Sequence, residues 1–143
     1  NKSDQEYWEK ISVDKAKEEM LNNIKLIGEL YKVELLPIQI MIICMNDLFQ
    51  ITEEGTKCLE EPDENKIECS LKLLQTIGEK LSKTTIINKY IEILNRLSKL
   101  KDKLSSRIRF ACEDIIELSK NNWIPKHQEL KPTTLIKARM YPE

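Results

Sequence analysis

A short segment occurs twice in this chain, and its recurrence limits the fold more than any other feature of the sequence. Ile24–Glu29 (IKLIGE) returns as Leu74–Glu79 (LQTIGE), and a fainter copy follows at Asp114–Glu117. The spacing of apolar residues places each copy in the first helix of a pair. Repeated helix pairs with a period of about forty residues are typical of HEAT-type α-solenoids. The sequence therefore predicts an all-α fold of about three stacked antiparallel helix pairs, with the period lengthened once by an acidic loop.

Apolar residues at spacings of three and four predict where the individual helices lie. Helices are expected at residues 14–31, 37–50, 65–81, 84–103 and 105–120. A last short helix is expected after Pro132, and residues 52–65 form the acidic loop. The more polar residues 1–13 are expected to be a flexible lead-in or a short helix, since Ser3 and Glu6 have the spacing of a capping box.

Two details of these helices make further predictions about packing. Gly28 and Gly78 hold the same position in the two copies of the repeat. A glycine inside a helix costs about 1 kcal/mol relative to alanine, so close approach of a neighbouring helix is expected at both positions. The helix expected at residues 37–50 is apolar nearly all round, and such a helix needs cover on several sides, which a stack provides.

The composition argues against catalysis and against a membrane-spanning segment. The chain of 143 residues has one histidine and none of the common nucleotide-binding, nucleophile or metalloprotease motifs. A single histidine removes most pairs of nucleophile and base, and neighbouring acids such as Glu18 and Glu19 are typical of solvated faces. The longest apolar stretch, residues 35–45, is too short to cross a bilayer. We therefore predict no catalytic residues, no cofactor, no enzyme activity and no membrane partner.

The four cysteines indicate a reducing compartment rather than a metal or disulfide site. Cys44, Cys69 and Cys112 lie in apolar helical stretches and are expected to be buried. Cys58 lies in the acidic loop and is expected to react first with a thiol reagent. None of them forms a C-x-x-C pair, and His127 is distant in the sequence, so no metal site is predicted.

Positive charge gathers near the end of the fourth expected helix, although the net charge of the chain is -1. The RNA-binding candidates are Arg96, Lys99, Lys101, Lys103, Arg107 and Arg109. Spacings of three and four place Arg96, Lys99 and Lys103 on one face of that helix. An ordinary solvated helix face is the alternative. If RNA binds here, the contacts go to phosphates, so binding should tolerate sequence changes and weaken with salt.

Several motifs follow one another along the chain in the order of a known domain. Asn23–Lys32 reads NIKLIGELYK, and the next copy of the repeat lies within Glu68–Gly78. Further along, Ser105–Phe110 reads SSRIRF, Asn122–Pro125 reads NWIP and Lys131–Thr134 reads KPTT. Over most of the chain, these motifs resemble the middle domain of the eukaryotic translation initiation factor 4 gamma family.

The resemblance implies a domain of five helix pairs, of which residues 1–143 would hold about the last three as a partial middle domain. The chain begins at Asn1 without methionine and stops at Glu143, so a piece of a larger protein is expected. The loop at residues 52–65 is longer than the usual loop of the family.

The resemblance also implies a function. It points to a cytoplasmic scaffold that binds the DEAD-box RNA helicase of translation initiation, holds it in an active conformation and contacts mRNA. Other initiation factors would be further partners, and the present helix pairs would face the N-terminal lobe of the helicase. The alternative is a same-fold RNA-binding or scaffold module of a paralogous translational repressor, mRNA-decay factor or splicing factor.

A second set of residues forms the candidates for contact with a partner protein. These are Lys32, Arg107, Arg109, Trp123 and Lys126. The two arginines match the family motif. They either brace the stack, with Arg109 paired to Glu113, or contact helicase or RNA, because cations in a first helical turn oppose the helix dipole. Trp123 either plugs a helix end or offers its ring to a partner.

Overall fold

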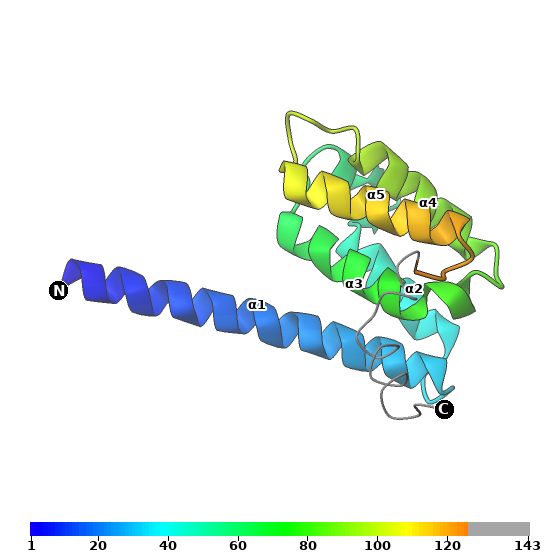
Figure 1. The fold of residues 1–143 in the computed structure, drawn as a ribbon, viewed down its shortest axis with the longest axis horizontal. Helices are drawn as coiled ribbons and strands as arrows, with labels where there is room; N and C mark the ends of the chain where they lie inside the picture. The colour runs from blue at the N-terminus through cyan, green and yellow to red at the C-terminus, as the bar shows by residue number, and fades with distance from the viewer. Residues whose placement is uncertain (126–143) are drawn as a thin grey trace, which may run out of the picture.

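The computed structural model describes residues 1–125, and this part of the chain is a stack of helices (Figure 1). The helices are α1 (Lys2–Lys32), α2 (Ile38–Leu48), α3 (Glu64–Leu81), α4 (Ile86–Leu97) and α5 (Ser106–Lys120). Between α2 and α3 lie the short strands β1 (Ile51–Thr52) and β2 (Gly55–Thr56) and the 3-10 helix η1 (Lys57–Leu59). The all-α prediction is confirmed. The short helix expected after Pro132 lies outside the described residues.

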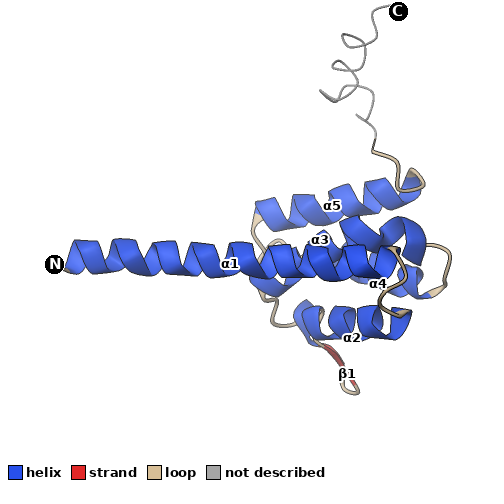
Figure 2. Ribbon diagram, turned by 90° about the horizontal axis from the view of Figure 1, so that it is seen from below, coloured by secondary structure: helices blue, strands red, loops and turns tan. Residues whose placement is uncertain are grey.

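The helices form two layers. α1, α3 and α5 lie side by side and run in the same direction, while α2 and α4 pack against them in the opposite direction (Figures 1 and 2). α1 with α2 and α3 with α4 are therefore antiparallel pairs, and α5 is the first helix of the predicted third pair. α3 lies at the centre of the stack, where Leu73, Leu74 and Ile77 are 0% exposed.

The start of α1 differs from the prediction. Residues 2–13 are neither a flexible lead-in nor a separate short helix, because they continue into α1 without interruption. Asn1 caps the helix instead of Ser3, and its side chain accepts a hydrogen bond from the Ser3 backbone N–H at 3.1 Å. Residues 2–16 are all exposed and extend beyond the other helices (Figure 1). About half of α1 thus stands free of the rest of the described chain.

The acidic loop between α2 and α3 contains regular structure. β1 and β2 form a hairpin that pairs Ile51 with Thr56 and Thr52 with Gly55, so the all-α stack also carries one very short antiparallel strand pair in this loop. Gly55 has φ +132°, a conformation that a glycine adopts without strain and that permits the tight turn. η1 then carries Cys58 into the core, where it is 0% exposed. The expectation of an exposed, most reactive Cys58 is therefore wrong.

α4 ends at Leu97 and does not reach Lys103, as the sequence had suggested. The chain bends after Leu97 because Leu104 enters the core, where it is 4% exposed. The bend also brings Ser105 to the start of α5, where its hydroxyl accepts a hydrogen bond from the Ile108 backbone N–H at 3.4 Å. The connection between α4 and α5 is consequently a loop on the surface of the stack.

The two recurring glycines each allow a close approach, but to different neighbours. A β-carbon at Gly28 would lie 2.8 Å from Cγ2 of Thr76, so α1 and α3 pack at short distance here. A β-carbon at Gly78 would overlap the indole ring of Trp123, which comes from the turn after α5. The prediction of a neighbouring helix is confirmed at Gly28, whereas at Gly78 the neighbour is a side chain.

α2 is covered on one side only in the described part of the chain. Met41 and Met45 are 0% exposed and face the core, but Ile43 on the opposite side is 65% exposed. The cover predicted on several sides of this apolar helix is therefore incomplete within residues 1–125.

Candidate interaction surfaces

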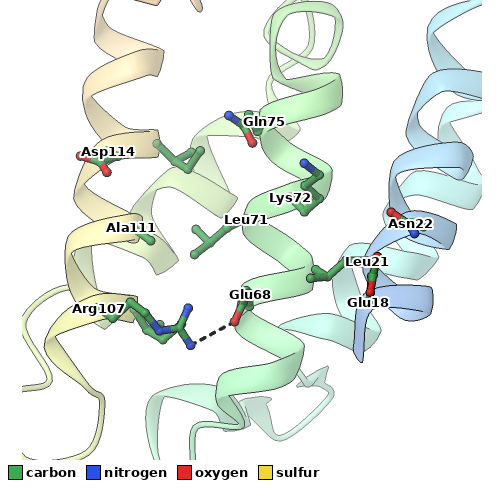
Figure 3. Close-up of a pocket in the computed structure, with 12 residues that line it drawn as sticks. Glu18, Leu21, Asn22, Glu68, Leu71, Lys72, Gln75, Arg107, Ala111 and Asp114 are labelled. Carbon is green, nitrogen blue, oxygen red and sulfur yellow. Dashed lines mark hydrogen bonds and ion pairs between the residues drawn. The ribbon is translucent and has the colours of Figure 1, made fainter. Parts of the chain in front are cut away.

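A groove with a volume of about 460 Å³ lies between α1, α3 and α5 (Figure 3). Leu21 of α1, Leu71 of α3 and Ala111 of α5 give it an apolar floor, and charged side chains such as Asp114 stand at its rim. A second hollow of about 300 Å³ shares Asp114 with the groove and continues along α5 toward Pro125. Together these hollows form an open surface along the layer of α1, α3 and α5.

Arg107 lies at one end of this groove and joins α5 to α3. Its Nη2 is 3.2 Å from Oε1 of Glu68 (Figure 3). Nζ of Lys17 is 3.0 Å from the same oxygen. Burial alone would raise the pKa of the Glu68 carboxyl, but hydrogen bonds from Lys17 and Arg107 outweigh it and hold the pKa below its usual value. The Arg107 side chain is still 63% exposed, so it braces the stack and can also meet a partner.

Arg109 turns back toward the loop between α4 and α5. Its Nε donates to the Leu104 carbonyl at 3.3 Å, and its Nη2 donates to the Ser106 hydroxyl at 2.8 Å. The predicted ion pair with Glu113 is wrong for the described structure, because these two bonds hold the guanidinium at the start of α5. Arg109 therefore stabilises the start of α5, in agreement with a bracing role.

The remaining cations of the predicted RNA-binding face do not share a helix face. Arg96 lies in the last turn of α4, whereas Lys99, Lys101 and Lys103 follow its end. Nζ of Lys103 donates to the Glu60 carbonyl at 2.9 Å and so ties the loop to η1. Arg96, Lys99 and Lys101 are exposed and form no ion pair within residues 1–125. These three residues lie at and just after the end of α4, and together they are called the basic loop.

Trp123 is held in an unusual turn after α5. Asn122 and Trp123 have φ 55° and 64°, a left-handed conformation that costs about 1–2 kcal/mol for residues other than glycine. The Trp123 N–H donates to the Leu118 carbonyl at 2.8 Å, which closes the turn. The six-membered part of the indole ring lies against the backbone of Gly78. Trp123 thus plugs the end of α3, as one of its two interpretations predicted.

The indole also borders a pocket of about 420 Å³ at the ends of α1 and α3. We call it the indole pocket. Its lining residues are Lys32, Glu34, Gln75, Thr76, Glu79, Lys80, Lys83 and Trp123. The structure thus brings together Lys32 and Trp123, two of the predicted partner residues, at the far end of α5 from Arg107 and Arg109. Lys126, the fifth, lies outside the described residues.

Sequence reasoning missed two lysines of this pocket, Lys80 and Lys83. Nζ of Lys80 donates to the Tyr31 carbonyl at 2.7 Å and lies 4.5 Å from the centre of the Tyr31 ring, which is buried. The signal was present in the repeat, because Lys80 stands where the first copy has the apolar Leu30. A lysine in one copy of the repeat, where the other copy has an apolar residue, indicates a contact that only the copy with the lysine makes.

The described residues contain no obvious centre for metal chemistry. Among residues 1–125, no group of three or more histidine, cysteine or acidic side chains could hold a metal ion. In the same part of the chain, no helix is both long enough and apolar enough to cross a membrane.

Comparison with known proteins identifies the family. The MIF4G domain family matches residues 9–122, which includes about half of the free segment of α1. Eukaryotic translation initiation factor 4 gamma 1 of Mus musculus is 35% identical over 124 residues, 85% of this chain and 7% of that protein. Eukaryotic translation initiation factor 4G of Cucumis melo is 42% identical over 112 residues, 76% of this chain and 6% of that protein.

A human relative gives the same result. Eukaryotic translation initiation factor 4 gamma 3 of Homo sapiens is 35% identical over 124 residues, again 85% of this chain and 7% of that protein. The chain thus spans only a small part of the length of the relatives it matches. It belongs to the MIF4G domain family, and its resemblance to the middle domain of eukaryotic translation initiation factor 4 gamma is confirmed.

Proposed function

We propose that this domain is a scaffold segment of cytoplasmic translation initiation that binds the DEAD-box RNA helicase of that process. The observation that carries the proposal is the groove between α1, α3 and α5, with its apolar floor and charged rim. Protein interfaces have this composition, since a buried apolar centre supplies affinity and a polar rim supplies orientation. The names of the relatives place them in translation initiation, which supports the choice of partner.

A blocking substitution in the groove tests the proposal. We expect Ala111→Arg to weaken helicase binding by about tenfold or more, because a long side chain on the floor displaces a buried partner group, and each 1.4 kcal/mol lost is a factor of ten. Isothermal titration calorimetry of the 143-residue chain with the helicase measures the change.

The matched control is Asn88→Arg, which places the same side chain at an exposed position of α4. It should leave the dissociation constant unchanged, and circular dichroism should show both variants folded. A folded Ala111→Arg variant that binds as tightly as the wild type would remove the groove from the interface.

A second function, RNA binding, is favoured by the basic loop of Arg96, Lys99 and Lys101. These cations are exposed and unpaired within the described part of a chain whose net charge is only -1. Such a local concentration of charge binds phosphates without reading bases. The domain would then contact mRNA while the groove holds the helicase.

Charge reversal in the loop tests RNA binding. We expect Arg96→Glu, Lys99→Glu and Lys101→Glu together to lower single-stranded RNA affinity by about tenfold or more at low salt. The slope of affinity against salt should fall by about 0.7 for each phosphate that the variant no longer neutralises. Fluorescence anisotropy at two salt concentrations measures both.

The matched control changes the same net charge on α1, through Lys10→Glu, Lys15→Glu and Lys25→Glu, all at exposed positions. It should retain most of the affinity. Equal losses in the two triple variants would mean that overall charge, and not the loop, governs binding.

A further inference from the structure

We infer that the indole pocket is a subsite for one nucleotide of single-stranded RNA, with the base against Trp123 and the phosphate near Lys32 and Lys83. The inference rests on the proposed RNA binding and adds a second contact site to it. The pocket lies at the C-terminal end of α5, whereas the basic loop lies at its N-terminal end. The 15 residues of α5 separate the two by about 22 Å, a distance that a few nucleotides of extended strand can span.

The position of Trp123 is the first argument. Two consecutive residues in the left-handed conformation hold the indole in place, although neither is a glycine. Gly78 of α3 leaves the space in which the ring lies. Backbone strain of this kind persists only where the surrounding structure holds it, so the indole has one fixed position. The ring is partly exposed and borders an open pocket, so it can receive a base, and stacking on an aromatic ring is worth about 1–3 kcal/mol per base.

The lysines supply the second argument. Lys83 is exposed, follows the end of α3 and forms no ion pair in the described part of the chain. Lys32 is paired only with the half-exposed Glu29, at 3.5 Å, and such a surface pair costs little to break. Both cations can therefore turn to a phosphate. Lys80 is different, because its bond to the Tyr31 carbonyl makes it part of the pocket wall.

The polar groups of the pocket can form the hydrogen bonds that a nucleotide base needs. Gln75 is exposed at the rim, and its amide can both donate to and accept from a base edge. A flat aromatic ring, an amide and mobile cations thus share one space of about 420 Å³, within the roughly 300–1,000 Å³ of small-ligand sites. An aliphatic protein side chain would use neither the amide nor the cations.

Two carboxylates of the pocket repel an anion. Removing one of them therefore tests whether the bound group is negatively charged. Glu34 lies 3.9 Å from Lys80, which offsets part of its charge. Glu79 lines the pocket without an ion pair in the described residues. Glu79→Gln should therefore strengthen RNA binding by about two- to fivefold, the effect of removing one repulsive surface charge.

Tryptophan fluorescence tests the stacking directly. Trp8→Phe removes the other tryptophan, at an exposed position of the free half of α1, and leaves Trp123 as the single reporter. We expect a short oligouridylate to quench most of the Trp123 emission at saturation. An oligomer of the same length without bases should bind through phosphates and cause little quenching. Lys32→Glu with Lys83→Glu should shift the quenching curve to about tenfold higher RNA concentration, since both positions face the phosphate.

The outcomes separate this inference from the proposed function. RNA binding by anisotropy without quenching of Trp123 would overturn the subsite and leave RNA binding at the basic loop intact. No RNA binding at all would overturn both. Quenching of Trp123 by the helicase but not by RNA would make the pocket a protein contact. If the lysine variants left the quenching by RNA unchanged, or if Glu79→Gln weakened it, the placement of the phosphate would be overturned. Circular dichroism of each variant, all at surface positions, confirms that the stack is folded.

Discussion

Replacing Gly28 with leucine is expected to lower the free energy of unfolding by about 3 kcal/mol, the upper end of the usual cost of overpacking a core. A β-carbon at this position would lie 2.8 Å from Cγ2 of Thr76, 3.1 Å from Cγ2 of Ile77 and 3.2 Å from Cδ1 of Leu73. Thr76 cannot turn away freely, because its hydroxyl donates to the Lys72 carbonyl at 2.9 Å. The better helix propensity of leucine returns only about 1 kcal/mol.

Urea unfolding followed by circular dichroism measures this loss. Asn23→Leu is the matched control, since it introduces the same side chain at an exposed position of α1. The control should change the free energy of unfolding by about 0.5 kcal/mol or less, as surface substitutions usually do. Similar values for the two variants would mean that α1 and α3 do not pack closely at Gly28.

Thiol labelling should distinguish Cys44 from the other three cysteines by a large factor. Cys58, Cys69 and Cys112 are 0%, 2% and 0% exposed, whereas Cys44 is only partly buried. Burial raises the pKa of Cys58 to about 11, and burial with the charges of Cys58 and Glu113 raises the pKa of Cys112 to about 12. We expect Cys44 to react roughly a hundredfold faster or more, because the buried thiols react only when the structure opens.

Mass spectrometry after timed exposure to a maleimide reads out which cysteine is modified. A uniform rate at all four positions in folded protein would contradict the burial described above.

The buried thiols also predict that the protein loses stability in alkali. An unfolded chain ionises its thiols near pH 9.0, but the folded protein keeps Cys58 neutral to about pH 11. The stabilisation is therefore present below pH 9 and is lost as the pH rises toward 11.

The periodicity of apolar residues predicted the helices well because it reports burial directly. The ends of the helices were harder, since they depend on what the following residues must reach. α4 stops at Leu97 because Leu104 enters the core, and no local signal separates residues 98–103 from a further turn of helix. This error also placed Lys99 and Lys103 on one helix face. The burial of Cys58 was missed for a similar reason. Most of its neighbours in the sequence are polar, so no local pattern shows that the chain returns to the core at this residue.

The interaction surfaces were predictable only in part. The sequence pointed to Lys32 and Trp123 separately, but nothing in it indicated that the two would border one pocket with Lys83. Such proximity depends on the packing of α1 on α3 and on the left-handed turn at Trp123. Glu68, which joins Lys17 and Arg107, was likewise visible only once the three helices lay side by side.

The free half of α1 gives one continuous helix two very different stabilities. Residues 2–16 bury no side chain in the described structure, so they are kept helical by local contacts and by propagation from the packed half. The local contacts are hydrogen bonds along the backbone, the Asn1 cap and a side-chain hydrogen bond from Gln5 to Glu9. An isolated helix of this length is marginal in water. The amide protons of residues 2–16 should therefore exchange with solvent through fraying from Asn1, whereas those beyond Lys17 should exchange only when the stack opens. On warming, this segment would lose its helicity first, and it could do so repeatedly without disturbing the core.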